Sequence, residues 1–334
     1  MIGYLLRRIA HALATIVVAV ALVFIAMRSL PGNPLLARFG QHPDAEQIER
    51  IRQANGWDRP MLEQLGKFFW QVVTTGDLGK SLVRTNSNVT AELARKVPAT
   101  IELTFAALCL ALPLGIGAGV MASVMRNRWP DRLCMVLSLL GVSIPVFFLG
   151  LCLQKTFTWL PTSQRLPPEI FDFEPLTGLY LFDTLWQGRP ALTLEAARHL
   201  LLPALVLATI PMAVIARITR ASMLEVLPAD FMRTAAAKGA SRWRRVLYHA
   251  LPAAAVPITN IAGLQIGLLL SGAVLTETVF DWPGVGRYLA DAVIRDKDYV
   301  AVQAAAIVIA ALFVSINLIL DIVYVWLDPR IRLR

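Results

Sequence analysis

Residues 103–125 read LTFAALCLALPLGIGAGVMASVM and contain no Asp, Glu, Lys or Arg. A bilayer core of about 30 Å is crossed by about 20 apolar residues in a helix. This stretch is therefore long enough and apolar enough to form one transmembrane helix. It decides the fold class, because the same pattern recurs along the chain.

The charge-free pattern occurs six times in the 334 residues, which predicts an all-α polytopic membrane protein with six transmembrane helices. Only 16% of the residues are charged and the mean hydropathy is +0.59, whereas soluble domains are roughly a quarter charged. This composition excludes a disordered, collagen-like or disulfide-rich secreted chain. The predicted spans are Ile9–Met27, Leu103–Met125, Leu133–Gln154, His199–Ala216, Val246–Thr276 and Tyr299–Leu320.

Details of these spans give further expectations. The first follows Arg7 and Arg8, as a signal peptide would, but its length and the absence of a small-residue cleavage site indicate an uncleaved span. The fifth exceeds one bilayer, so part of it is expected to belong to the preceding loop. Prolines within spans are expected to bend or break helices: Pro113, Pro145, Pro203 and Pro211.

Both termini are predicted to be cytoplasmic. Six spans put the two ends on one side, and Lys and Arg concentrate in cytoplasmic loops. With the N-terminus inside, the inside segments carry 15 basic and 5 acidic residues, and the outside segments carry 17 basic and 18 acidic residues. The net charge of +9 is therefore a topology signal, and nucleic-acid binding is excluded as its reason.

The chain is predicted to consist of three parts. Residues 1–30 hold the N-terminus and the first span, and residues 31–97 form an extracytoplasmic insertion with helices from about Pro43 to Gly56 and from Pro60 onward. Residues 98–334 form the membrane core with five spans. The core carries a cytoplasmic loop at 222–251 and extracytoplasmic insertions at 161–198 and 281–298.

No pattern typical of a catalytic or metal site occurs: HExxH, GxSxG and CxxC are absent and the four histidines are scattered. Cys109, Cys134 and Cys152 lie in apolar stretches and are interpreted as small buried hydrophobic residues. Residues 79–81 resemble the end of a phosphate-binding loop, but Thr74 stands where that loop requires glycine. We therefore predict no catalysis, no cofactor and no metal in this chain.

Three carboxylates near the ends of predicted spans are candidates for a proton relay: Glu102, Glu277 and Asp321. A relay is expected nearer the membrane midplane. We interpret these groups as satisfied at the interface or inside the helix bundle. A secondary transporter with inverted repeats stays a remote alternative.

The cytoplasmic loop is patterned as two helices. Asp230 opens a helix over Phe231–Lys238, Gly239 ends it in the left-handed conformation, and Ser241 caps a second helix over Arg242–His249. A short alanine-rich helix with a glycine exit suits docking into a groove of another protein. An amphipathic helix lying on anionic lipid is the alternative.

This loop resembles the EAA motif of ABC importer permeases. Aligned on Gly239, Ala235 matches the second alanine and Leu251-Pro252 match the trailing Leu-Pro, whereas Arg233 and Thr234 replace the glutamate and the first alanine. The run 233–239 is similar to the peptide-permease form R-T-A-x-A-K-G. The resemblance extends over the chain: L-R-R at 6–8, P-G-x-P at 31–34, G-x-D-x-P at 56–60, G-D-L-G-x-S at 76–81, P-A-T-x-E-L at 98–103, L-T-E-T-x-F-x-W-P-G-x-G-R at 275–287 and D-P-R-I-R at 328–332.

The resemblance implies a type I ABC importer (MetI-like) permease fold in a bacterial cytoplasmic membrane, most like the first, B-type subunit of a dipeptide transporter. It implies a second homologous permease, two ATP-binding cassette ATPases that bind ATP and Mg, and an extracytoplasmic binding protein as partners. Membrane lipid surrounds the spans. The ATPase-coupling residues that it implies are Phe231, Arg233, Thr234, Ala235, Ala236, Lys238, Gly239, Leu251 and Pro252.

A second set of residues forms either an extracytoplasmic gate or a turn that only caps the bundle: Glu277, Trp282, Pro283, Gly284, Gly286 and Arg287. The cargo expected from the resemblance is di- or oligopeptides. Nickel or glutathione imported by the same architecture is the alternative.

Overall fold

The computed structural model describes residues 2–29, 45–54, 56–81, 83–84, 87–170 and 172–327. These residues form helices and connecting loops, and pairing between extended segments within them is limited to a single bridge of Lys80 with Asn88. The chain divides into two compact units. Unit 1 comprises Met1–Thr100 with Pro283–Arg334, and unit 2 comprises Ile101–Trp282.

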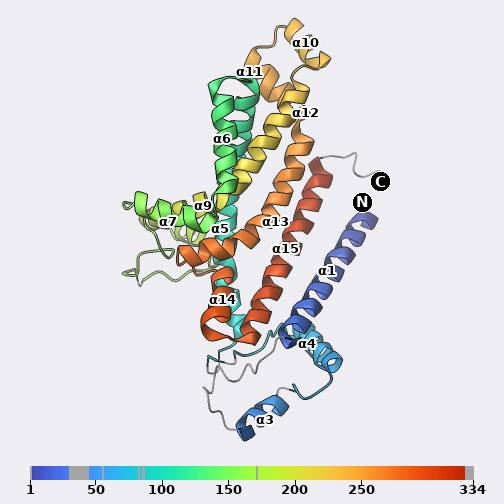
Figure 1. The fold of residues 1–334 in the computed structure, drawn as a ribbon, viewed down its shortest axis with the longest axis vertical. Coiled ribbons are helices and arrows are strands. Elements are labelled where there is room, and N and C mark those ends of the chain that lie inside the picture. The colour runs from blue at the N-terminus through green and yellow to red at the C-terminus, as the bar shows by residue number, and fades with distance from the viewer. Residues whose placement is uncertain are drawn as a thin grey trace. The chain divides into compact units, whose positions relative to one another are not determined.

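In unit 1 the first and last long helices, α1 and α15, pack side by side (Figure 1). The shorter α4 packs on α1, where the Phe24 and Phe68 rings lie 5.6 Å apart. The helices of this unit are α1 (Ile2–Ser29), α3 (Ala45–Ala54), α4 (Met61–Thr75), the first turns of α5 (Val89–Val124), α14 (Val285–Asp291), a π-helical turn (Ala292–Asp296) and α15 (Tyr299–Leu327).

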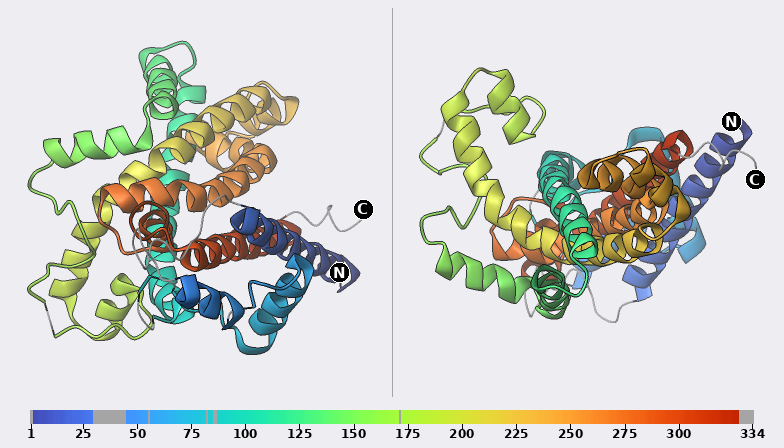
Figure 2. Two further views of the ribbon diagram at one scale, coloured as in Figure 1. Left: turned by 60° about the horizontal axis from the view of Figure 1, so that its bottom comes forward. Right: turned by 90° about the horizontal axis from the view of Figure 1, so that it is seen from above.

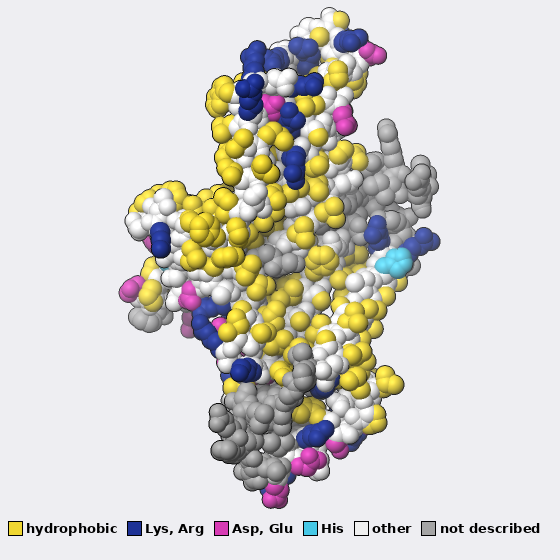
Figure 3. Space-filling view, in the orientation of Figure 1, with side chains coloured by type: hydrophobic (Ala, Val, Ile, Leu, Met, Phe, Trp, Pro, Cys, Tyr) yellow, Lys and Arg dark blue, Asp and Glu magenta, His cyan; other side chains and the backbone are white. Residues whose placement is uncertain are grey.

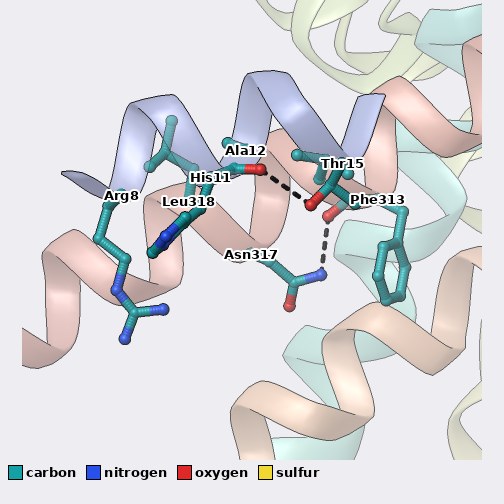
Figure 4. A pocket seen from close by; sticks show the side chains of 8 residues that line it. Arg8, His11, Ala12, Thr15, Phe313, Asn317 and Leu318 are labelled. Carbon is teal, nitrogen blue, oxygen red and sulfur yellow. Dashed lines mark hydrogen bonds between the residues drawn. The ribbon is translucent and has the colours of Figure 1, made fainter. Parts of the chain in front are cut away.

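A hollow of about 220 Å³ lies between α1 and α15 near Arg8 and His11 (Figure 4). The Thr15 hydroxyl donates to the His11 carbonyl at 2.8 Å, and the Asn317 amide donates to the Phe313 carbonyl at 2.9 Å. Each of these donors is therefore satisfied by its own helix, which removes the cost of placing it among apolar side chains.

In unit 2 the long helix α9 is the centre of packing, and α13, α6, α7 and α8 all contact it. Figures 1 and 2 show α9 and α13 running through the middle of the ribbon beside α6. The helices of this unit are the remainder of α5, α6 (Trp129–Ser143), α7 (Val146–Thr156), α8 (Tyr180–Trp186), α9 (Pro190–Val226), α10 (Asp230–Ala237), α11 (Arg242–Arg245), a π-helical turn (Val246–Ala250), α12 (Leu251–Ala253) and α13 (Ala255–Val279).

Four predicted spans lie in single helices that are long and apolar enough to cross a membrane, α1, α5, α9 and α15. The third predicted span, residues 133–154, is divided between α6 and α7, which meet at 108° and are apolar enough to form a span only when taken together. The fifth run is also broken, with α11 to α12 bent by 64° from α13. Its first part therefore belongs to the preceding loop, as expected. The described helices give four to six spans, depending on whether each bent pair crosses once.

Proline breaks only one of the helices in which it was expected to act. Pro145 follows Ile144, whose extended backbone (φ −80°, ψ 124°) ends α6, because the proline ring disfavours the helical conformation of the residue before it. Pro203 and Pro211 lie inside the continuous α9, and Pro113 lies inside the continuous α5. These three prolines therefore do not break their helices, since packed neighbours support a helix that lacks single backbone bonds.

The cysteines also differ from expectation. Cys109 and Cys152 are exposed and Cys134 is half-buried. All three are free thiols. The prediction that they are buried was wrong because an apolar run in a membrane helix places residues on the lipid-facing side as readily as on the packed side.

Two glycines bring α5 and α9 into close contact. A methyl group added at Gly119 would lie 2.5 Å from the Ala216 carbonyl oxygen, and one added at Gly115 would lie 2.9 Å from that of Met212. The exposed Gly117 between them has open space. This G-x-x-x-G spacing is typical of closely packed membrane helices.

Candidate functional site

The loop between α9 and α13 folds into the two helices that its sequence predicts. Residues Asp230–Ala237 form α10, close to the predicted 231–238. Ser241 caps the next helix, with its hydroxyl accepting from the Arg244 amide at 3.4 Å. This second helix is α-helical only to Arg245 and continues as a π-helical turn to Ala250.

Gly239 ends α10 in the left-handed region, with φ +80°. The Ala240 amide donates to the Ala235 carbonyl at 3.1 Å, and the Gly239 amide donates to that of Ala236 at 2.9 Å. These bonds satisfy carbonyls that the helix end would leave unpaired. A Cβ at Gly239 would meet nothing within 4 Å, so the backbone angle and not internal crowding favours glycine here.

The two sides of α10 have different surroundings. Met232 and Ala235 are buried, and Met232 belongs to a cluster that contains Val120 of α5 and Met223 of α9. The other predicted coupling residues of this helix point outward, and Phe231 is 46% exposed. The outward side carries Phe231, Arg233, Thr234, Ala236, Ala237 and Lys238.

The trailing Leu251-Pro252 pair lies where α11 and α12 lead into α13. Leu251 packs against the same cluster as Met232, and Pro252 is exposed in the short α12. The cluster also includes Ala254 and Ile258, so residues from α5, α9, α10, α12 and α13 meet around one end of unit 2. Some of the predicted coupling residues are therefore exposed, and the others are packed against the interior of unit 2.

Basic side chains gather at this end of unit 2 (Figure 3). The exposed ones are Arg126, Arg128, Arg132, Arg217, Arg233, Lys238, Arg242 and Arg244. Two further contacts tie the helices together here. Arg220 binds the buried Asp131 with two hydrogen bonds, one of 2.9 Å from Nη2, and Arg242 donates to the Val124 carbonyl at the end of α5 at 2.9 Å. The helices that carry the exposed basic residues are therefore held together by these two contacts.

The predicted gate residues in unit 2 are buried. Glu277 is 0% exposed and Trp282 is 1% exposed, and the Trp282 amide donates to the Glu277 carbonyl at 2.8 Å. The Arg165 guanidinium lies 5.6 Å from the Trp282 ring centre and forms an ion pair with Glu102. Sequence reasoning missed Arg165, because its partner is 63 residues away and no local pattern marks it.

Glu102 is one of the three carboxylates near span ends, and the interpretation that it is satisfied is confirmed. Its other oxygen accepts from the Leu181 amide at 2.8 Å, and Arg165 also donates to the Gly178 carbonyl at 2.7 Å. The side chain of Asp321 lies outside the described residues.

The remaining predicted gate residues, Pro283, Gly284, Gly286 and Arg287, belong to unit 1 and start α14. The Val285 amide donates to the Thr100 hydroxyl at 2.9 Å, which joins residues 98–100 to residues 283–287 within this unit. Gly286 is buried, and Arg287 lies 3.7 Å from a carboxylate oxygen of Asp291 in its own helix. These residues therefore form the start of α14, where the Thr100 hydroxyl caps the first helical amide.

In the segment that resembles the end of a phosphate-binding loop, the Gly79 amide and the Ser81 hydroxyl are engaged by carboxylates of this chain. The Gly79 amide donates to Asp77 at 3.0 Å, and the Ser81 hydroxyl donates to the buried Asp298 at 2.5 Å. Asp298 also accepts from the amides of Val300 and Ala301 at the start of α15. This motif therefore joins a loop to a helix end. No group of three metal-binding side chains occurs among the described residues.

Family profiles match both halves of the chain. Residues 111–333 match the binding-protein-dependent transport system inner membrane component family, and residues 1–104 match the N-terminal domain of the same systems. The chain belongs to this family. It is a membrane permease subunit with the fold of this class, and several long apolar helices fit a multi-pass inner-membrane component.

Curated relatives align with this permease from end to end. It is 40% identical to the dipeptide transport system permease protein DppB of Alkalihalophilus pseudofirmus, over 99% of this chain and 100% of the relative. It is 42% identical to the di/tripeptide transport system permease protein DppB of Pseudomonas aeruginosa, over 99% of each chain. It is 37% identical to the glutathione transport system permease protein GsiC of Escherichia coli, over 99% of each chain.

Proposed function

We propose that this permease carries di- or oligopeptides into the cytoplasm as one membrane subunit of an ATP-driven importer. The names of the full-length relatives at 40% and 42% identity support this cargo. A second homologous permease, two ATPases that bind ATP and Mg, and an extracytoplasmic binding protein complete the assembly. The work comes from the ATPases, and this chain supplies the path and the mechanical link.

The single observation that supports the link is the two-sided α10. Its exposed side presents the Phe231 ring and small alanines to a partner, while Met232 is buried in the cluster with Val120 and Met223. Close-packed side chains transmit displacement because they leave no free volume to absorb it. Movement of an ATPase against α10 is therefore passed to α5, α9 and α13.

The orientation in the membrane follows from charge. The exposed basic residues around α10 and α11 favour a cytoplasmic location for this end of unit 2. The same assignment places both termini in the cytoplasm and residues 161–198 outside. It also puts α10 on the side where ATP is available.

Glutathione is a second candidate cargo, because the glutathione permease is 37% identical over nearly the whole chain. Uptake of labelled dipeptide, glutathione and nickel by cells that lack this gene, with and without its restoration, separates these candidates. Lost and restored dipeptide uptake is the expected result. Loss of glutathione or nickel uptake alone would replace the cargo and keep the architecture, and no change in any of the three would contradict the proposed transport.

A further inference from the structure

Unit 1 contains a cavity of about 340 Å³ beside the end of α1 that carries Phe24 and Arg28. It is lined by α1, the turn before α4, α4 itself, residues 77–80 and the start of α15. None of the roles discussed above uses this cavity. In the proposed orientation it lies at the outer surface of the membrane.

Arg28 is held at the cavity wall with part of its guanidinium unused. Its Cζ atom lies 4.6 Å from the Phe24 ring centre and 5.4 Å from that of Trp57, and its Nε donates to Gln64 at 3.0 Å. Among the described residues, its two Nη groups have neither a hydrogen-bond acceptor nor a carboxylate partner. A guanidinium has five donors, so most of its capacity is available to an anion.

The other charges of the cavity add to this positive excess. Lys67 and Lys80 line it and form no ion pair within the described part of the chain. Glu63 is neutralised by Arg59 at 2.6 Å, and Asp77 accepts hydrogen bonds from Gln71 and Gly79 at 3.0 Å each. The lining holds four cationic side chains (Arg28, Arg59, Lys67 and Lys80) and two anionic ones (Glu63 and Asp77), so its net charge is positive and attracts a negative ligand.

A buried amide in the cavity wall also lacks a protein partner. Gln303 of α15 is 5% exposed and lines the cavity, yet its side chain has no hydrogen bond to any described residue. Buried polar groups are nearly always hydrogen-bonded. Because Gln303 lines the cavity, its amide is available to hydrogen-bond a polar ligand there.

The surfaces next to the cavity are apolar and exposed. On α1, Val17 and Leu22 are 50% and 62% exposed, and on α4, Leu62, Trp70 and Val73 are 82%, 72% and 79% exposed. The α1 residues belong to a candidate span, so they contact acyl chains. Tryptophan is enriched at the level of the lipid headgroups, which fits α4 lying in that layer. The positively charged cavity therefore lies beside apolar surfaces of α1 and α4 that can contact the acyl chains of a lipid.

We propose that this cavity binds the phosphate of an anionic phospholipid, with Arg28, Lys67 and Gln303 as its donors. The acyl chains lie along the exposed apolar side chains of α1 and α4. Free inorganic phosphate shares the headgroup chemistry but not the apolar contacts, so only the lipid uses both parts of the surface.

The test is native mass spectrometry of the purified importer complex titrated with phosphatidylglycerol or with phosphatidylcholine. Arg28→Gln is expected to weaken phosphatidylglycerol binding about tenfold, as the loss of charge-assisted hydrogen bonds predicts. Lys67→Gln, at an exposed position without an ion pair to a described residue, is expected to weaken it by a smaller factor with no effect on assembly. Arg52→Gln is the matched control, because Arg52 is an exposed arginine of α3 that does not line the cavity.

Unchanged phosphatidylglycerol binding in both Arg28→Gln and Lys67→Gln would overturn the proposal. Displacement of the lipid by millimolar inorganic phosphate would reassign the cavity to a free anion, and displacement by a dipeptide would reassign it to cargo. Neither effect is expected. Because the readout is lipid binding, its failure is distinct from failure of the proposed transport.

Discussion

Single buried charges determine much of the local order in unit 2. Arg165 is 5% exposed and Glu102 is 8% exposed, and together they tie the loop at 161–178 to the start of the second span. The Arg165 guanidinium also lies 3.6 Å from the Tyr180 ring centre. Removing one member of such a pair leaves an uncompensated buried charge, which costs more than losing both members.

We expect Glu102→Gln to destabilise the permease by about 3 kcal/mol, because it leaves the Arg165 guanidinium buried without a counter-charge. The double variant Glu102→Gln with Arg165→Met is expected to recover part of this loss. Thermal unfolding of the purified protein in detergent measures both. A double variant less stable than Glu102→Gln alone would contradict this account of the pair.

Gly239 has a backbone conformation that favours glycine, and it also lies at the end of the helix that is proposed to couple to the ATPase. We expect Gly239→Asp to leave the permease inserted and to abolish transport, because a side chain strains the φ of +80° and obstructs close approach of the ATPase. Uptake and ATPase co-purification measure the effect. Gly188→Asp is the matched control, since Gly188 also has a positive φ, +68°, and open space around it. Equal loss of transport in both variants would argue for general strain and against docking at α10.

At the scale of elements, the contact of α5 with α9 depends on residues without side chains. Gly115 and Gly119 lie one turn apart and face α9, whereas Gly117 does not. The carbonyls of Met212 and Ala216 occupy the space that side chains would need. The backbones can therefore approach closely, and this approach supports the cluster that anchors α10.

We expect Gly119→Ala to destabilise the permease by about 2 kcal/mol, because overpacking of a close helix contact typically costs between about 1 and 3 kcal/mol. Gly117→Ala is expected to be neutral or slightly stabilising, since alanine favours a helix over glycine by up to about 1 kcal/mol. Comparison of the two variants by thermal unfolding in detergent tests this. A Gly119→Ala variant as stable as Gly117→Ala would show that the helices can separate without cost.

For the whole molecule, the distribution of charge sets the orientation. The basic residues near α10 and α11 lie at one end of unit 2, and the connection from α7 to α9, which carries Glu174, belongs to the part predicted outside. Moving several unpaired arginines across a bilayer is costly. We therefore expect the chain to insert with this end of unit 2 in the cytoplasm.

Labelling with a membrane-impermeant maleimide tests this orientation in a variant without the three native cysteines. Glu174→Cys is expected to react in intact spheroplasts, and Ala237→Cys only after permeabilisation; both positions are exposed. Reaction of Ala237→Cys from outside would reverse the topology and remove α10 from the ATPases.

The features predicted well from the sequence are those that depend on neighbouring residues. Apolar length marked the continuous helices α1, α5, α9 and α15, and the pattern at 230–241 predicted α10, its left-handed end at Gly239 and the cap at Ser241. The G-x-x-x-G spacing at 115–119 was also readable, but sequence reasoning did not use it. These signals are local because hydrogen bonds within a helix join residues only four apart.

The tertiary structure decided which residues that are distant in the sequence contact each other. It paired Glu102 with Arg165 and Ser81 with Asp298, which are 63 and 217 residues apart, and it set the 108° bend between α6 and α7. It also decided that Met232 of α10 is buried in the cluster while Phe231 faces outward. The sequence by itself determined which segments leave water and where their helices end, because burial of apolar length and local capping need no distant partner. Pairing and packing required the fold, because their free energy depends on contacts that exist only after the helices have met.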